Sequence, residues 1–109
     1  MEIIDPADVE NMRAGGRKLF LVDVRNPDEY EEIRAKGAVL FPLPELDPEA
    51  IREAHQAGGF DEEKIYVICR SGARSANAAG QLEAAGMQAV NVTGGTLAWD
   101  AAGLPVEKG

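Results

Sequence analysis

The chain has 109 residues, 45% of them hydrophobic, which is the length and composition of one ordinary domain with an apolar core. Its formal net charge of -8 disfavours an extended nucleic-acid surface, which needs clustered lysines and arginines to neutralise phosphates. We therefore expect a single domain over residues 1–109 and no nucleic-acid partner.

Short apolar runs alternate with helix-forming stretches along the whole chain. The expected strands are Glu2–Ile4, residues 20–24, residues 39–41, a run from Ile65 that ends at Cys69, and Ala89–Val92. Proline after an Asp or Asn cap marks helices that begin at Pro6, Pro27 and Pro48, and glycines mark helix ends at Gly15 and Gly58. Two further helices are expected, from about Arg74 to Ala85 and through Trp99 to Gly103.

This alternation predicts a three-layer α/β/α fold with a five-stranded parallel sheet, because parallel neighbours are normally joined by a helical crossover. Such sheets bind ligands at the carboxyl ends of their strands. Three polar features fall at those ends: Asp23 with Arg25, the loop at residues 69–75, and the segment 94–96. We expect them to form one site.

Cys69 is the only cysteine, and it stands where the apolar run Ile65–Ile68 gives way to the sequence CRSGARS. An ordinary thiol with a pKa of about 8.5 is only a few per cent ionised at pH 7, so a nucleophile needs surroundings that favour the thiolate. Free N–H groups at a helix start and neighbouring guanidinium groups do so. We expect the amide ring, Arg70 and Arg74 to act together, without a histidine base. The only histidine, His55, lies in a polar stretch and is expected on a solvated helix face.

The other loop residues are candidates for binding an anionic substrate. Backbone N–H groups of residues 70–74 can point inward, and Gly72 lets the backbone curl. The candidate substrate-binding residues are Arg70, Ser71, Gly72, Ala73, Arg74 and Ser75. At least one arginine is expected to contact the anion, whereas Ser71 and Ser75 could either cap the helix or touch substrate. Asp23 and Arg25 are expected to support the site structurally.

One thiol allows no internal disulfide, and a reducing cytoplasm is the expected compartment. The N-terminal residues carry early acidic groups without a signal-peptide core, and no segment approaches the roughly 20 apolar residues of a membrane span. The sequence contains no metal-ligand cluster, nucleotide-binding glycine motif or flavin site. We expect no cofactor, no metal and no membrane partner.

Several motifs, in order and spacing, resemble the rhodanese domain. They are LVDVR at residues 21–25 with Glu29 and Tyr30, Gly37 with Ala38, the loop at residues 69–75, GGTLAW at residues 94–99, and GLPV at residues 103–106. The resemblance implies thiosulfate or another sulfane-sulfur donor as substrate and a persulfide on Cys69. It also implies that cyanide or a thiol then accepts the sulfur, which makes the protein a thiosulfate sulfurtransferase. One departure is Arg34, which stands where the family has a histidine.

Two other functions share this loop. A sulfur-relay module would carry persulfide on Cys69 from one protein partner to another, with the same sequence. A cysteine-dependent phosphatase of the same fold would need an arginine after five intervening residues, whereas Arg74 follows Cys69 after only four and Ser75 holds the next position. The loop from Cys69 to Arg74 is then one residue too short to enclose a phosphate, and the phosphatase interpretation is disfavoured.

Overall fold

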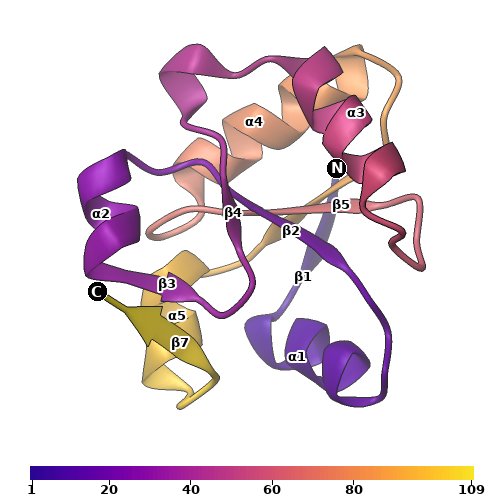
Figure 1. The fold of residues 1–109 in the computed structure, drawn as a ribbon. Helices are drawn as coiled ribbons and strands as arrows, with labels where there is room; N and C mark the ends of the chain where they lie inside the picture. Colours follow the sequence, from indigo (N-terminus) through magenta and orange to yellow (C-terminus); the bar gives the residue numbers. More distant parts are fainter.

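A five-stranded parallel sheet runs through the middle of the molecule (Figure 1). The computed structural model describes residues 1–109. The strands of this sheet are β1 (Glu2–Ile4), β2 (Phe20–Asp23), β4 (Val39–Leu40), β5 (Ile65–Ile68) and β6 (Ala89–Val92), in the spatial order β1-β6-β5-β2-β4. All four neighbouring pairs are parallel, so the expected fold class is confirmed.

Helices cover both faces of the sheet. They are α1 (Pro6–Ala14), α2 (Pro27–Glu32), α3 (Pro48–Ala57), α4 (Ala73–Ala84) and α5 (Gly95–Ala101), with a 3-10 turn η1 (Leu43–Glu45). A proline opens each of the first three helices, where its fixed φ suits the helix and its missing N–H costs nothing. Figure 1 shows α3 and α4 above the sheet and α1 and α5 below it. None of these helices has the length and apolar character to cross a membrane.

The side chains of the central strand alternate between two hydrophobic clusters. Ile65 and Val67 face one cluster, with Ile51 of α3 and Leu82 of α4. Tyr66 and Ile68 face the other, with Val9 of α1 and Trp99 of α5. Because β5 is central and buried on both faces, the chain segment that follows it starts at the centre of the sheet edge. That segment begins with Cys69.

A second, two-stranded antiparallel sheet was not expected from the sequence. It pairs β3 (Ile33–Ala35) with β7 (Val106–Lys108), in the register Ile33↔Lys108 and Ala35↔Val106. Its strands have three residues each and lie far apart in sequence, so neither shows a readable alternation of its own. Arg34 fits this corner: its guanidinium lies 4.9 Å from the centre of the Tyr30 ring, and its Nη1 donates to the Tyr30 carbonyl.

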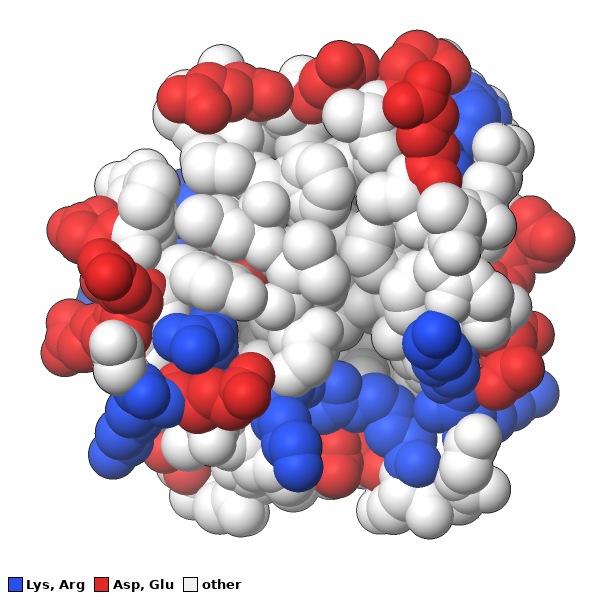
Figure 2. Space-filling view, in the orientation of Figure 1, with Lys and Arg blue, Asp and Glu red and all other residues white.

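Acidic side chains ring the face of the molecule seen in Figure 2, and basic side chains gather in a band across its lower part. Carboxylates are interleaved with these basic groups, in keeping with the net charge of -8. This face therefore carries no extended basic surface.

Candidate active site

Cys69 follows β5 directly and lies between the ends of β2 and β6. The residue is 1% exposed. Its carbonyl oxygen accepts hydrogen bonds from the Thr96 amide at 2.8 Å and the Thr96 hydroxyl at 3.0 Å. The structure thus brings the loop at residues 69–75 and the start of α5 together at one sheet edge, as their positions after strands indicate.

Gly95 permits this close approach of α5 to the loop. A Cβ atom at residue 95 would lie 2.5 Å from the carbonyl oxygens of both Cys69 and Arg70. The residue also has a φ of +59°, in the left-handed region. Only glycine fits here without moving the backbone on which the sulfur sits.

The Cys69 sulfur is surrounded by hydrogen-bond donors. Gly72, with a φ of 116°, turns the chain so that its N–H points at Sγ, with N and S 3.0 Å apart. The Ser75 hydroxyl oxygen lies 3.3 Å from the same sulfur. Burial raises the pKa of the Cys69 thiol, but the Ser75 hydroxyl and the amides of Ser75, Gly72 and Ser71 outweigh it, so the pKa falls below its usual value. The loop favours the thiolate.

Hydrogen bonds within the loop, ahead of the arginines, are the leading causes that lower the pKa of Cys69. Arg74 binds Glu29 of α2 in a bidentate ion pair, with N–O distances of 2.7 and 2.9 Å. The hydrogen bond to Glu29 is the main cause that raises the pKa of Arg74, and the negative charge of the Cys69 thiolate also raises it. Arg70 is exposed and makes no ion pair. The hydroxyl and the amides acidify the sulfur, while Arg74 ties the loop to α2.

Ser75 is packed against the Cys69 sulfur. Its side chain is fully buried and contacts Sγ, the Gly72 carbonyl at 3.1 Å and the Asn91 Oδ1 at 2.5 Å. Ser75 therefore lies directly against the sulfur, and its contact with substrate stays a prediction. Ser71 and Ala73 are exposed on the outer side of the loop, and Ala73 is the first residue of α4.

Two residues that contact the loop were not predicted from the sequence as part of the site. Glu29 belongs to an acidic run that is most simply interpreted as a solvated helix face, yet it caps the Asn26 amide and holds Arg74. Asn91 sits in the middle of β6, with its side chain on the α4 face, against Ser75 and Gly72. A polar residue at an inward position of the apolar strand Ala89–Val92 is the signal that could have revealed it.

Asp23 and Arg25 form a buried ion pair at the end of β2. The two side chains are 0% and 4% exposed, and Arg25 Nη2 lies 2.7 Å from the Asp23 carboxylate. Arg25 Nη2 also donates to the carbonyl of Ile33 at 2.6 Å. The pair joins the sheet edge to the start of β3, beside the candidate site.

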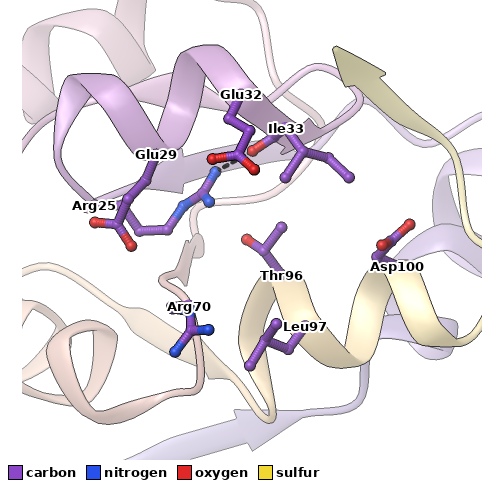
Figure 3. Close-up of a pocket in the computed structure, with 8 residues that line it drawn as sticks. All are labelled: Arg25, Glu29, Glu32, Ile33, Arg70, Thr96, Leu97 and Asp100. Atoms are coloured by element: carbon purple, nitrogen blue, oxygen red, sulfur yellow. Dashed lines mark hydrogen bonds between the residues drawn. The ribbon is translucent and has the colours of Figure 1, made fainter.

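A cleft of about 210 Å³ opens next to the loop (Figure 3). Its lining residues come from the end of β2, from α2, from the loop and from α5: Arg25, Glu29, Glu32, Ile33, Arg70, Thr96, Leu97 and Asp100. Figure 3 shows Glu32 on the α2 side of the cleft and Arg70 on the opposite side. Because Arg25 and Glu29 are paired, the charges without an ion-pair partner are Arg70, Glu32 and Asp100.

His55 does not take part in this site. Its Nε2 lies 2.7 Å from the carbonyl oxygen of Glu62, and its ring stacks on Phe60 with ring centres 5.8 Å apart. Glu62 precedes β5, so the histidine is at the opposite end of that strand from Cys69. The expectation of a solvated histidine is wrong, since the ring is half-buried against aromatic side chains.

Glu29→Gln is expected to make the free energy of unfolding depend less on pH in the acidic range. The Arg74 hydrogen bond leads the effects that lower the pKa of Glu29, from 4.5 to about 2. A carboxylate with a depressed folded-state pKa stabilises the protein above its unfolded pKa, and this stabilisation is lost as the pH falls from about 4.5 to 2. Urea unfolding at several pH values should show a flatter decline for the variant over that window. An unchanged decline would show that the ion pair contributes nothing.

Taken together, the fold and the loop define an α/β domain that presents a thiolate-stabilising cysteine loop at the carboxyl end of a parallel sheet. Comparison with known proteins gives its family. The model of the rhodanese-like domain matches residues 5–102, so the chain belongs to the rhodanese-like domain family.

Three known proteins illustrate the likeness. The chain is 35% identical over 103 residues to the "Putative sulfurtransferase YtwF" of Bacillus subtilis, covering 92% of this chain and 93% of that protein. The crystal structure of a rhodanese-like domain protein from Staphylococcus aureus is 31% identical, with a TM-score of 0.72 and 91% of each chain covered. A thiosulfate sulfurtransferase structure from Pseudomonas aeruginosa is 25% identical with a TM-score of 0.75, and the match covers 99% of this chain but 19% of that one.

Proposed function

We propose that this protein is a sulfurtransferase in which Cys69 accepts a sulfane sulfur from thiosulfate or a persulfide and passes it to cyanide or a thiol. Membership of the rhodanese-like family and the likeness to a named sulfurtransferase support a sulfur-transfer or sulfur-relay role. The observation that carries the proposal is the Cys69 sulfur, which faces the Gly72 amide and the Ser75 hydroxyl.

In the first step the Cys69 thiolate attacks the outer sulfur of thiosulfate. A bond forms between Sγ and that sulfur, the S–S bond of thiosulfate breaks, and sulfite leaves with the electron pair. Sulfite is stable as an anion, so the step needs no general acid. The anionic persulfide that forms lies within the same ring of amides, which stabilises negative charge before and after transfer.

In the second step a nucleophile attacks the outer sulfur of the persulfide. With cyanide, a carbon–sulfur bond forms, the persulfide S–S bond breaks, and thiocyanate leaves while the Cys69 thiolate is restored. A thiol acceptor takes the sulfur in the same way and becomes a persulfide. The cycle is a double displacement that needs no oxidant, metal or cofactor.

The loop does not favour phosphate ester hydrolysis. Such chemistry needs a free arginine to close the ring around a phosphate, and Arg74 is engaged by Glu29. The position of the arginine in the larger phosphatase ring is held by Ser75, which is buried behind the sulfur. A single transferred sulfur atom suits the smaller ring.

Replacing both Glu32 by Gln and Asp100 by Asn is expected to raise kcat/KM for thiosulfate about two- to tenfold at low salt. These carboxylates line the cleft without ion-pair partners and repel a dianion that approaches Arg70. The gain should shrink at high ionic strength, because salt screens exposed charges. Glu83→Gln, on the exposed side of α4, is the matched control and should change little. An equal rate in all three proteins would show that the cleft is not the route of approach.

Intact mass spectrometry of the purified protein tests the proposed function directly. Treatment with thiosulfate should add the mass of one sulfur atom, and cyanide should then remove it. Persulfide donors and thiosulfate can be compared at matched concentrations: loading by a persulfide alone favours a relay role over a thiosulfate enzyme. A mass unchanged by every sulfane-sulfur donor contradicts the proposal.

A further inference from the structure

Behind the sulfur lies a buried polar chain that the transfer chemistry alone does not require. Cys69 Sγ, Ser75 Oγ and Asn91 Oδ1 follow one another at 3.3 and 2.5 Å. Ser75 is fully buried and Asn91 is 8% exposed, so bulk water does not compete for these hydrogen bonds. Resting on the proposed role of Cys69 as nucleophile, we propose that Asn91 is a positioning residue whose side-chain oxygen holds the Ser75 hydroxyl proton away from the sulfur.

The orientation of the Asn91 amide follows from its second contact. Asn91 Nδ2 donates to the Gly72 carbonyl oxygen at 3.3 Å. If the amide were turned over, Oδ1 would face that carbonyl, and two acceptors would be left opposite each other. The bond to Gly72 therefore keeps Nδ2 on the loop and presents Oδ1 to Ser75.

A hydroxyl has one proton, and the Ser75 proton has three acceptors within reach: Sγ, the Gly72 carbonyl and Asn91 Oδ1. The shortest of these contacts is the one to Asn91. While the proton is there, an oxygen lone pair of Ser75 faces the sulfur, and it suits a neutral S–H that donates to it. When the thiol ionises, the Ser75 proton must leave Asn91 and turn to the anion. Asn91 thus competes with the sulfur for this one proton and limits how far the Ser75 hydroxyl can favour the thiolate.

The charged groups near the sulfur are two ion pairs and the exposed, unpaired Arg70. Arg74 of α4 is paired with Glu29 of α2, and Arg25 is paired with Asp23 at the end of β2. From α5, the residues packed on the loop are the uncharged Gly95, Thr96 and Leu97. Asn91 and Ser75 are accordingly the neutral groups that can tune the sulfur.

A double-mutant cycle on the full chain tests the inference. The pH dependence of thiolate formation is followed by ultraviolet absorbance and by the rate of iodoacetamide alkylation, since Cys69 is the sole cysteine. The four proteins are wild type, Asn91→Leu, Ser75→Ala and the double variant. Leu has a similar size but accepts no hydrogen bond, so it frees the Ser75 proton for the sulfur. With Ser75 present, Asn91→Leu should lower the thiol pKa by about one unit relative to the same change made in Ser75→Ala.

Asn91→Asp is expected to change the thiol pKa in the opposite direction, because a carboxylate accepts a hydrogen bond from Ser75 more strongly than an amide does. It should raise the thiol pKa, and by more when Ser75 is present than when residue 75 is alanine. This arm also keeps the inference testable if Asn91→Leu does not fold, as judged by near-ultraviolet circular dichroism. Equal shifts in both Ser75 backgrounds, or a pKa raised by Asn91→Leu only when Ser75 is present, would overturn the inference.

These measurements use the resting protein without a sulfur donor, so their outcome is separable from that of the sulfur-loading experiment. Loading at Cys69 without coupling between Asn91 and Ser75 rejects only the role of Asn91. Coupling without loading by any donor rejects the sulfurtransferase proposal and leaves the control of the thiol in place.

Discussion

Cys69→Ser is expected to abolish sulfur transfer from thiosulfate to cyanide and to leave the fold intact. A serine hydroxyl remains protonated at neutral pH and forms no persulfide, so the loop amides have no anion to stabilise. The change removes no side-chain volume of consequence from a residue that is 1% exposed, and the hydroxyl can use the Gly72 amide and Ser75 as partners. Thiocyanate production and intact mass after thiosulfate are the measurements.

Wild-type protein alkylated with iodoacetamide is a useful control, because it blocks the same sulfur without a mutation. Both proteins should show no added sulfur, while their far-ultraviolet circular dichroism matches the untreated chain. Thiocyanate formed by a homogeneous Cys69→Ser preparation would place the nucleophile elsewhere and remove the basis of the proposed function.

Gly95→Ala is expected to cost about 2–6 kcal/mol of stability, from left-handed backbone strain and overpacking together. The added Cβ would meet the carbonyl oxygens of Cys69 and Arg70 at 2.5 Å, and backbone atoms cannot move aside as a flexible side chain can. Either the start of α5 or the loop must shift. Since the loop holds the sulfur, a folded variant should also load sulfur more slowly. Urea denaturation and the loading rate give the two readouts.

Gly80→Ala is the matched control for that substitution. Gly80 lies within α4, and a Cβ there has no neighbouring atom within 4 Å. Alanine in a helix interior is expected to stabilise the protein by about 0.5–1 kcal/mol relative to glycine. If Gly95→Ala proved as harmless as Gly80→Ala, the contact between α5 and the loop would not be tight.

The loop shows that the partner of an arginine cannot be predicted from its own neighbourhood in the sequence. Arg74 lies five residues after Cys69, but Glu29 reaches it from α2, 45 residues earlier. Arg70 has no such partner and lines the cleft, so contact of Arg70 with an incoming anion stays a prediction. Which of two neighbouring arginines is free depends on a distant carboxylate.

The sequence alone determined the order and type of the main elements and the position of Cys69. Proline-opened helices and β-branched runs are local signals, so Pro6, Phe20 and Ile65 could be placed without any knowledge of their partners. The parallel sheet follows from that alternation, and the carboxyl ends of its strands give the location of the site.

Only the tertiary structure decided what surrounds the sulfur. The pairing of β3 with β7, the capture of Arg74 by Glu29 and the contact of Asn91 with Ser75 all join residues from different elements. Such contacts depend on packing distances and on which face of a strand a side chain occupies, and neither quantity is encoded in a local pattern of residue types. The sequence therefore predicted Cys69 as the nucleophile, whereas the packing of α2, α4 and β6 around it set its hydrogen-bond partners and its neighbours.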